Sequence, residues 1–531
     1  MDVVDYVVVG GGSSGCVLAG RLSEDPNVRV LLLEVGQGKP DSSLVTMPAA
    51  VLAMAPNRIN NWAFSTVPQK GLNGRQGFQP RGKVLGGSSA INAMVYIRGH
   101  RTDYDRWAQE GAEGWSWDDV LPYFLRAESN KDFHNEWHGQ EGPLSVSRLR
   151  TDNPFQNHYL QAAREAGFAV IEDFNGPEQE GIGIYQVTQI EGERCSAYRA
   201  YVQPHRTARP NLRVETGAQA ERILFEGRKA VGVQYRWAGR TLTVRAQREV
   251  LVCAGAFQSP QLLMLSGIGD ARELHQLGID VLHHLPGVGQ NLQDHPDFIF
   301  GYRSEDLHLV GLSMQGFRQL FREWQRYRQE RRGLLTTNYA EGGGFLKTRP
   351  DLDAPDIQLH FVVAVVDNHG RTLHRGHGFS CHVCLLRPKS RGSVRLKGRQ
   401  ITSAPLIDPA FLDDPADLET MVQGYKLTEK LMQAPSLLSH RQSDLFTPHV
   451  RTDAEIRAVL RERVDTVYHP VGTCKMGRDP WAVVDPELRV HGVEGLRVVD
   501  ASVMPSLIGG NTNAPCIMIG EKAVDLIRAT K

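Results

Sequence analysis

The sequence predicts an α/β fold that begins with a dinucleotide-binding unit and continues into a second part built around another sheet. Three features support this prediction: an apolar strand that runs into glycines near the N-terminus, further small-residue loops at 81–92 and 254–269, and strand-like alternation at 357–366 and 378–386. The chain has 531 residues, 41% hydrophobic and 23% charged, so it can bury a large core.

The first element is a βαβ unit. A buried strand at Asp5–Val9 is followed by Gly10-Gly11-Gly12-Ser13-Ser14-Gly15, which matches G-x-G-x-x-G, and a helix is expected over Cys16–Ser23. A second strand, Val28–Leu33, ends at Glu34. The glycines allow a pyrophosphate to approach the helix N-terminus, and the acid can accept hydrogen bonds from a ribose diol. The unit predicts an ADP-containing cofactor, FAD or NAD, between which its position does not discriminate.

Two later loops bear on the choice between FAD and NAD. Arg81–Asn92 combines paired glycines with hydroxyls, which either forms a tight turn or lets backbone amides approach an anion or a flat ring. Ala254–Gly269 is expected to contain a strand end, a glycine turn and a helix that Ser259-Pro260 begins and Gly267 closes.

With the C-terminal segments 468–477 and 499–515, these loops resemble the glucose-methanol-choline (GMC) flavoprotein oxidoreductases, over residues 5 to about 528. Within that family the phrases at 61–64, 93–100 and 388–392 are most similar to bacterial choline dehydrogenases and alcohol dehydrogenases of alkane degradation. The resemblance implies a GMC oxidoreductase fold, in which an FAD-binding Rossmann-like domain (1–155, 212–300 and 464–531) is intertwined with an α+β substrate-binding domain (156–211 and 301–463).

The resemblance also implies the site. Flavin-dependent alcohol oxidation needs a base for the hydroxyl proton while the carbinol hydride moves to flavin N5, and an imidazole of ordinary pKa, about 6.5, is suitable. This role falls on His469, with Asn511 binding the substrate oxygen and Trp62 and Tyr468 at the substrate. The expected FAD contacts are the glycine motif and Glu34, together with Val84, Gly87, Ser88, Asn92, Ala93, Met94, Val95, Ala220, Asp500, Ala501, Asn513 and Pro515.

Two details concern the flavin. Some relatives attach FAD covalently through a histidine in the first glycine loop, where this chain has Ile91, so FAD is expected to bind noncovalently. A helix over Ile517–Ile527 is expected to direct its N-terminus at the flavin pyrimidine, where it would stabilise the anionic reduced flavin.

The expected function is oxidation of small primary alcohols to aldehydes, with electrons passed to a quinone or an artificial acceptor. Choline dehydrogenase and an oxygen-dependent aryl or furan alcohol oxidase remain alternatives, and choline would need an aromatic cage to which Trp62, Tyr468 and an acid such as Glu341 could contribute. Hydroxynitrile lyases, photodecarboxylases and a non-catalytic flavin-binding protein are alternatives of other classes.

Composition limits the partners. Lys and Arg number 60, as do Asp and Glu, so no nucleic-acid partner is expected. Seven scattered cysteines, no signal-peptide pattern and no apolar run of membrane-spanning length favour the cytoplasm. No metal site is expected, because Cys381 and Cys384 would point to opposite faces of a strand and, as the resemblance implies, Asn291–His295 forms a structural turn.

An amphipathic helix is expected over Leu312–Arg332. Aromatic and aliphatic residues recur at helical spacing, and six arginines occupy the remaining surface. The helix either packs on the substrate-binding part with a solvated basic face or makes a peripheral contact with the anionic inner membrane.

Overall fold

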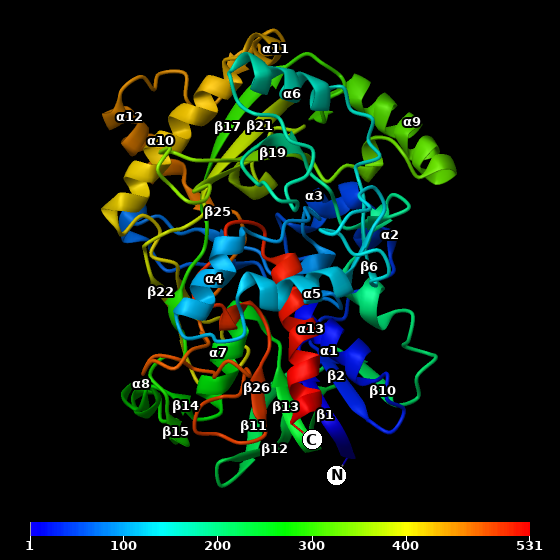
Figure 1. Ribbon diagram of the computed structural model, residues 1–531, viewed down its shortest axis with the longest axis vertical. Coiled ribbons are helices and arrows are strands. Elements are labelled where there is room, and N and C mark those ends of the chain that lie inside the picture. Colours follow the sequence, from blue (N-terminus) through cyan, green and yellow to red (C-terminus); the bar gives the residue numbers. More distant parts are fainter. Residues whose placement is uncertain (1, 531) are drawn as a thin grey trace.

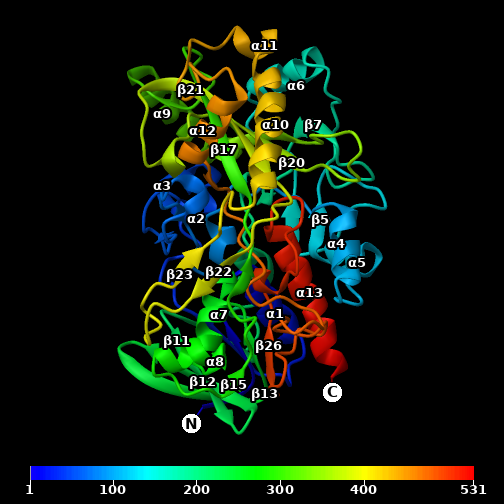
Figure 2. The same ribbon diagram turned by 90° about the vertical axis from the view of Figure 1, so that its left-hand side faces the viewer.

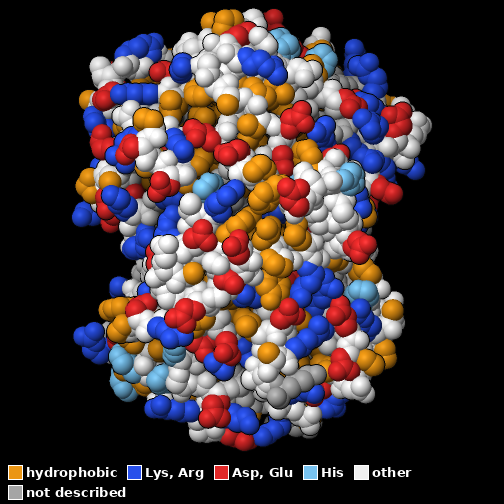
Figure 3. Space-filling view, in the orientation of Figure 1, with side chains coloured by type: hydrophobic (Ala, Val, Ile, Leu, Met, Phe, Trp, Pro, Cys, Tyr) orange, Lys and Arg blue, Asp and Glu red, His pale blue; other side chains and the backbone are white. Residues whose placement is uncertain are grey.

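The computed structural model describes residues 2–530, which form two halves stacked along the long axis, with both ends of the chain in the lower half (Figure 1). Acidic and basic side chains are interspersed over the face shown in Figure 3, and hydrophobic side chains gather in a strip at its middle. Within residues 2–530, no helix is both long and apolar enough to cross a bilayer.

The lower half contains a sheet of order β10-β2-β1-β13-β12-β11, with β26 beside β13. The neighbours of β1 run parallel to it, whereas β11, β12 and β13 form an antiparallel meander. These strands are β1 (Asp2–Val9), β2 (Val30–Glu34), β10 (Leu212–Thr216), β11 (Gln219–Glu226), β12 (Lys229–Trp237), β13 (Arg240–Val252) and β26 (Leu496–Val498). The βαβ unit predicted from the first glycine motif is therefore present.

Helices α1 (Ser13–Leu22) and α13 (Asn513–Ala529) pack against one another beside this sheet, and α7 (Gly255–Leu265) follows β13. Each begins earlier than predicted. The start of α7 at Gly255 rather than at Ser259 follows from capping, because the Asp500 carboxylate accepts hydrogen bonds from the Gly255 N–H (2.8 Å) and the Ser259 hydroxyl (2.6 Å). Pro260 consequently lies inside the helix.

The upper half contains an antiparallel sheet of order β24-β17-β21-β20-β19-β7, with β18 and β25 paired at its margins. Its strands are β7 (Gly181–Ile184), β17 (Pro296–Ser304), β18 (Gly311–Leu312), β19 (Ala340–Leu346), β20 (Ile357–Val362), β21 (Gly376–Leu385), β24 (Ser443–Asp444) and β25 (Asp465–Thr466). Strands were expected at both β20 and β21. Because β17 and β25 draw on residues 296–300 and 465–466, the sheet includes residues that the sequence placed in the FAD-binding part.

Helices α6 (Phe155–Glu165), α10 (Pro415–Met432) and α12 (Asp453–Arg463) lie around the upper sheet, and a small sheet of β16 (Gln290–Leu292), β22 (Gly392–Arg395) and β23 (Leu406–Asp408) lies between the halves (Figure 2). The remaining helices are α2 (Ser43–Thr46), α3 (Val51–Met54), α4 (Arg101–Gln109), α5 (Trp117–Ala127), α8 (Ala271–Gln276), α9 (Met314–Glu330) and α11 (Pro435–Leu438). Short helical turns are η1 (Pro48–Ala50), η2 (Lys70–Leu72), η3 (Gly87–Ala90), η4 (Tyr198–Val202), η5 (Leu334–Thr336), η6 (Asn368–Gly370) and η7 (Ala501–Val503), and short strands are β3 (Phe64–Ser65), β4 (Phe78–Gln79), β5 (Glu128–Asn130), β6 (Leu144–Val146), β8 (Gln189–Ile190), β9 (Glu193–Arg194), β14 (Ile268–Gly269) and β15 (His283–His284).

The two cysteines of β21 lie in separate core clusters. Cys381 belongs to the cluster that includes Phe379 and Tyr425, whereas Cys384 belongs to the one that includes Tyr185. Each cysteine of the chain is free, and within residues 2–530 no group of His, Cys, Asp and Glu is arranged to hold a metal ion. The two thiols thus occupy opposite faces of the strand.

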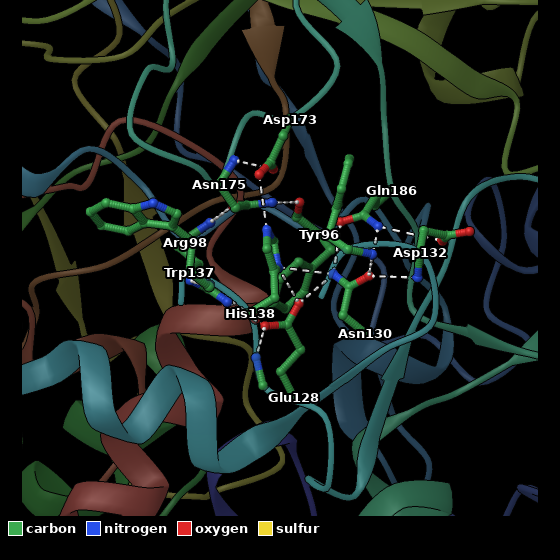
Figure 4. Close-up of polar contacts among 12 residues, drawn as sticks. Tyr96, Arg98, Glu128, Asn130, Asp132, Trp137, His138, Asp173, Asn175 and Gln186 are labelled. Atoms are coloured by element: carbon green, nitrogen blue, oxygen red, sulfur yellow. Dashed lines mark hydrogen bonds and ion pairs between the residues drawn. The ribbon is translucent and has the colours of Figure 1, made fainter. Parts of the chain in front are cut away.

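A buried polar network joins residues 96–138 to residues 173–186 (Figure 4). Arg98 pairs with Glu128, both fully buried, and His138 bridges from Glu128 (Nδ1 to Oε1, 3.1 Å) to Asp173 (Nε2 to Oδ2, 2.9 Å). Asn175 accepts a hydrogen bond from the Arg98 N–H at 2.9 Å. Because unpaired buried charges are costly, these mutually satisfied groups hold the segment before Arg98 firmly in place.

Candidate active site

A cavity lies between the two sheets and is lined by residues from both. Its lower end follows the carboxyl ends of β1 and β2 at Gly10 and Glu34, and its upper end is bounded by His360 of β20 and His382 of β21. The carboxyl edge of a parallel sheet is the usual place for a bound nucleotide in an α/β fold. The cavity therefore joins a nucleotide cradle to a pocket under the upper sheet.

The floor of the cradle is made of backbone. A Cβ at Gly10, whose φ is +106°, would lie 2.4 Å from the Cys253 carbonyl oxygen, and a Cβ at Gly87 would lie 2.7 Å from Gly12 Cα. The first and second glycine loops are thus in direct contact, so no side chain separates a ligand from their N–H groups. This geometry suits a pyrophosphate.

Two helix N-termini converge on the same place. The Ser13 hydroxyl donates to Asn513 Oδ1 at 2.7 Å, and the Ser14 hydroxyl donates to the Cys516 carbonyl at 2.7 Å, which joins the first turns of α1 and α13. Both helix ends carry partial positive charge and favour an anionic ligand. Because α13 begins at Asn513, four residues before the predicted Ile517, Asn513 lies in its first turn.

Glu34 occupies the end of β2. Its Oε2 accepts a hydrogen bond from the Gly11 N–H (3.0 Å) and its Oε1 accepts one from the Gly36 N–H (2.7 Å). Burial raises the pKa of this carboxyl, and these backbone donors act in the opposite direction. The carboxylate therefore braces the first glycine turn, and each oxygen keeps a lone pair for a ribose hydroxyl.

Most of the predicted cofactor residues line this cavity, but three do not. Gly15 packs on the backbone of Gly10, Val84 is fully buried in a small apolar cluster, and Pro515 is buried in α13. Those that line it are Gly10, Gly12, Ser13, Ser14, Glu34, Gly87, Ser88, Asn92, Ala93, Met94, Val95, Ala220, Asp500, Ala501 and Asn513. The Asp500 carboxylate caps α7, so its side chain positions the cradle wall.

The predicted base lies at the junction of cradle and pocket. His469 Nε2 is 3.2 Å from the Asn511 amide nitrogen, and Asn511 Oδ1 accepts a hydrogen bond from Gln358 Nε2 at 3.0 Å. Because that bond assigns the oxygen of Asn511, its NH₂ faces His469, and His469 Nε2 must be the acceptor.

His295 assigns the other ring nitrogen. His295 Nε2 lies 3.1 Å from the carbonyls of Leu386 and Ile508, which only an N–H can satisfy, and His295 Nδ1 lies 3.0 Å from His469 Nδ1. His469 Nδ1 therefore carries a hydrogen and donates a hydrogen bond to His295 Nδ1. The resulting tautomer leaves the lone pair of His469 Nε2 directed at Asn511, as a general base requires.

The electrostatics agree with this assignment. Burial, together with His295, His360 and Arg81, lowers the pKa of His469 well below 6.5. Burial likewise lowers the pKa of His295 to about 3. Both imidazoles are consequently neutral near pH 7.

The sequence analysis missed the contribution of the segment Asn291–His295. It is a structural turn as expected, since Asn291 and Gln293 both donate to the Pro505 carbonyl, and Asp294 accepts the backbone N–H of His469 at 2.8 Å. His295, at the end of this turn, also contacts the predicted base. A turn that is structural can therefore position the site as well.

Two further polar residues of the pocket were also missed. His360 is 5% exposed, and both its ring nitrogens lack a hydrogen-bond partner among the described residues. His382 Nδ1 is 2.6 Å from Asp297 Oδ2. Gln358 and His360 stand at alternating positions of an apolar strand, which was the available signal that one face of β20 is polar.

The predicted substrate residues both line the cavity. Trp62 stacks on Phe64 with ring centroids 5.5 Å apart, and Lys83 Nζ lies 4.3 Å from its ring centre. The Tyr468 hydroxyl is 2.8 Å from His369 Nδ1. Glu341, considered as an anchor for a cation, does not line the cavity, and its carboxylate accepts hydrogen bonds from Thr151, Gln156 and Thr337.

Models of the GMC oxidoreductase family match residues 4–297 and 388–520. The chain belongs to the GMC oxidoreductase family. It is 46% identical to an alcohol dehydrogenase [acceptor] of Pseudomonas putida (98% of this chain, 95% of the relative) and 44% identical to human mitochondrial choline dehydrogenase (99% and 90%). An oxygen-dependent choline dehydrogenase of Sinorhizobium medicae is 43% identical (98% and 95%).

Solved structures confirm the GMC fold. A formate oxidase superposes with a TM-score of 0.92 at 29% identity over 100% of this chain and 98% of that one. Pyridoxine 4-oxidase from Mesorbium loti gives 0.87 at 31% identity over 98% of both chains. The chain is therefore an FAD-dependent oxidoreductase, and the backbone floor and paired helix N-termini fit that cofactor.

Proposed function

We propose that this enzyme oxidises small primary alcohols to aldehydes, with His469 as the general base, and passes the electrons to a quinone-type acceptor. The observation that carries the proposal is the pairing of a neutral imidazole with an amide donor at the mouth of the cradle: His469 Nε2 and the Asn511 NH₂ lie 3.2 Å apart. FAD, when bound, accepts the hydride of the carbinol carbon at N5.

In this proposal the substrate hydroxyl replaces the direct hydrogen bond between His469 and Asn511 and bonds to both side chains. His469 Nε2 takes the hydroxyl proton, and the Asn511 NH₂ donates a hydrogen bond to the oxygen as negative charge develops. The amide of Asn511 cannot rotate freely because Gln358 holds its oxygen. Arg81, which lines the same cavity, adds a positive charge near the developing alkoxide.

The lining of the pocket favours a neutral alcohol over choline. Among the described lining residues, the carboxylates are Glu34 and Asp500, and both belong to the cradle. Asp297 does not line the cavity and pairs with His382, and Glu341 is fully hydrogen-bonded away from it. A quaternary ammonium would meet Trp62 and Tyr468 but no carboxylate, and Trp62 already lies against Lys83.

Choline remains the second candidate, supported by the 43–44% identity to choline dehydrogenases. Anaerobic mixing with a panel of primary alcohols and with choline, followed by the loss of the flavin absorbance, distinguishes the two. The proposal requires faster reduction by an uncharged primary alcohol. Faster reduction by choline would assign the enzyme to choline, and no reduction by any alcohol would leave only a lyase or an inert flavoprotein.

The acceptor and location are the remaining parts of the proposal. The similarity to an enzyme named alcohol dehydrogenase [acceptor] supports transfer of the electrons to a separate acceptor. We propose that this acceptor is a quinone, and a quinone dissolved in a membrane would require a peripheral position of the enzyme on that membrane. Stopped-flow reoxidation of the reduced enzyme by a soluble quinone and by air-saturated buffer tests the acceptor. Faster reoxidation by dioxygen at comparable concentration would make the enzyme an oxidase.

A further inference from the structure

Helix α9 (Met314–Glu330) is amphipathic, but its apolar side faces solvent. Met314 is 76% exposed, and Phe317 and Phe321 are each 61% exposed. At about 100° per residue these side chains fall on one side of the helix with Leu320 and Trp324, which are 45% and 42% exposed. The side that packs on the protein carries Gly316, Gln319, Glu323, Arg326 and Tyr327. The helix therefore does not bury its apolar side, as a helix packed on a core would.

The charges around this apolar side are all positive. Arg318 and Arg322 flank it and have no acidic partner among residues 2–530, and Arg328 lies 4.9 Å from the ring centre of Trp324. The acids of the helix point elsewhere, since Glu323 accepts the Leu334 N–H at 2.7 Å and Glu330 pairs with Arg326 at 3.3 Å. Within α9 the outward surface is thus apolar and cationic with no carboxylate.

The same character continues into a neighbouring loop. Leu373 is 74% exposed between the exposed residues Arg371 and Arg375, and Leu312, 45% exposed just before α9, forms a β-bridge with Arg375. The loop and the N-terminal end of α9 are therefore adjacent. Together they carry neighbouring exposed apolar side chains with arginines beside them, a combination that marks interaction sites.

The loop that carries Leu373 lies next to residues that line the active-site cavity. Gly370 lies in the turn before Leu373, and a Cβ at Gly370 would be 3.9 Å from Leu52 Cδ2. Leu52 is 37% exposed and lines the cavity, as does His369. In both views α9 lies at the outer margin of the upper half, where it can meet a flat partner (Figures 1 and 2).

We propose that α9, Leu312 and Leu373 form a docking surface for an anionic lipid bilayer. The helix lies in the membrane plane, its apolar side chains enter the boundary between headgroups and acyl chains, and its arginines contact lipid phosphates. Docking in this orientation brings the lining residues Leu52 and His369 near the lipid, on the side from which a membrane-soluble quinone would approach. The last step rests on the proposed acceptor, whereas the docking does not.

The test is cosedimentation of the FAD-loaded enzyme with vesicles of phosphatidylcholine alone or mixed with phosphatidylglycerol. We expect binding to the anionic vesicles that weakens as salt is added. Arg318→Gln with Arg322→Gln should weaken binding about 25-fold, at roughly fivefold for each arginine near an anionic surface. Phe317→Ser with Phe321→Ser should weaken it at least about 10-fold.

Trp481→Ser with Arg272→Gln is the matched control. Trp481 is 55% exposed and the Arg272 side chain 89% exposed, and neither belongs to the docking surface. The control should bind as the parent does. Equal binding by the parent and both α9 variants, or no binding by the parent, would overturn the proposal.

A protein partner is the competing occupant. The proposal is overturned if the parent does not bind vesicles and light scattering shows that it is a dimer, which the double variant Phe317→Ser with Phe321→Ser converts to a monomer. The surface would then be an interface between two copies of the chain. Alcohol-dependent reduction of a soluble dye, measured without vesicles, should be the same in all variants. Failure of the parent to bind vesicles while it still reduces the dye refutes the docking alone, and vesicle binding by a parent that does not oxidise alcohols refutes the proposed function alone.

Discussion

Replacing His295 tests whether the base depends on a second histidine. Two substitutions separate the roles of its ring. His295→Phe removes the hydrogen-bond acceptor for His469 Nδ1–H, whereas His295→Gln retains an oxygen that can accept that hydrogen bond. His295 lies 3.0 Å from His469 and is not expected to touch the substrate, so it is a positioning residue. The expected defect is therefore in the orientation and tautomer of His469.

The magnitude follows from the hydrogen bond that is lost. A buried N–H left without an acceptor costs about 1–3 kcal/mol, which the His469 ring can relieve by turning or changing tautomer. If the whole cost appears in the activation free energy of flavin reduction, that range corresponds to roughly a 5- to 150-fold slower reduction for His295→Phe. His295→Gln should recover most of the rate.

The assay is anaerobic stopped-flow reduction by a saturating primary alcohol across pH. Burial holds the pKa of His469 well below 6.5 in the parent, so the parent rate should not vary between about pH 6.5 and 8. A neutral His295 that accepts the Nδ1–H bond stabilises the protonated form of His469, so His295→Phe should lower that pKa further and its rate should also be independent of pH over this range. Recovery of the rate by His295→Gln therefore separates loss of the acceptor from a general structural defect.

His377→Gln is the control, because His377 is buried and bonds the Leu309 carbonyl but does not line the cavity. The reasoning is refuted if His295→Phe keeps its FAD and reduces it at the parent rate. It is also refuted if His295→Phe and His295→Gln are equally slow, or if the rate of His295→Phe falls as the pH is lowered from 8 to 6.5.

Three further outcomes are expected. His469→Ala should keep FAD but lose about 10²–10⁴ in flavin reduction rate, and Asn511→Ala should also slow it; parent rates in stopped flow would contradict both roles. Acid should release FAD from the polypeptide, since Ile91 offers no nucleophile, and flavin retained on the denatured chain would show a covalent bond. Burial opposes protonation of His138, but its hydrogen bonds to Asp173 and Glu128 prevail and raise its pKa. Its contribution to the free energy of unfolding should therefore be complete below pH 6.5 and be lost as the pH rises through the raised pKa. In denaturant unfolding, the parent and His138→Gln should differ most at low pH.

The βαβ unit could be predicted because its constraints are local. The turn after Val9 must have glycine, since a Cβ at Gly10 would collide with the Cys253 carbonyl, and the acid at the end of the next strand braces that turn. Helix starts were less predictable, because distant residues cap them. The start of α7 depends on Asp500, which lies far away in sequence.

From the sequence, candidate site residues could be predicted only where they lie within a recognisable motif. His469 and Asn511 lie in recognisable segments, but the residues that give His469 its tautomer come from other strands and turns: His295 follows the turn before β17, and Gln358 lies on β20. Nothing near His469 in sequence indicates either contact. Such positioning becomes visible only when the two sheets are placed around one cavity.

For α9, the sequence predicts the helix but not which of its sides packs on the protein. The periodicity of its apolar residues is clear in the sequence, and a helix does form where it was predicted. Periodicity states that one side is apolar, but not whether protein covers that side. Here the packed side is the polar one, where Glu323 bonds the Leu334 N–H and Tyr327 is buried, and the apolar side is left outward. Exposure of Phe317 and Phe321 to water is unfavourable, and Arg318 and Arg322 beside them have no carboxylate partner within residues 2–530. The proposed docking surface therefore fits an apolar and anionic partner from outside these residues.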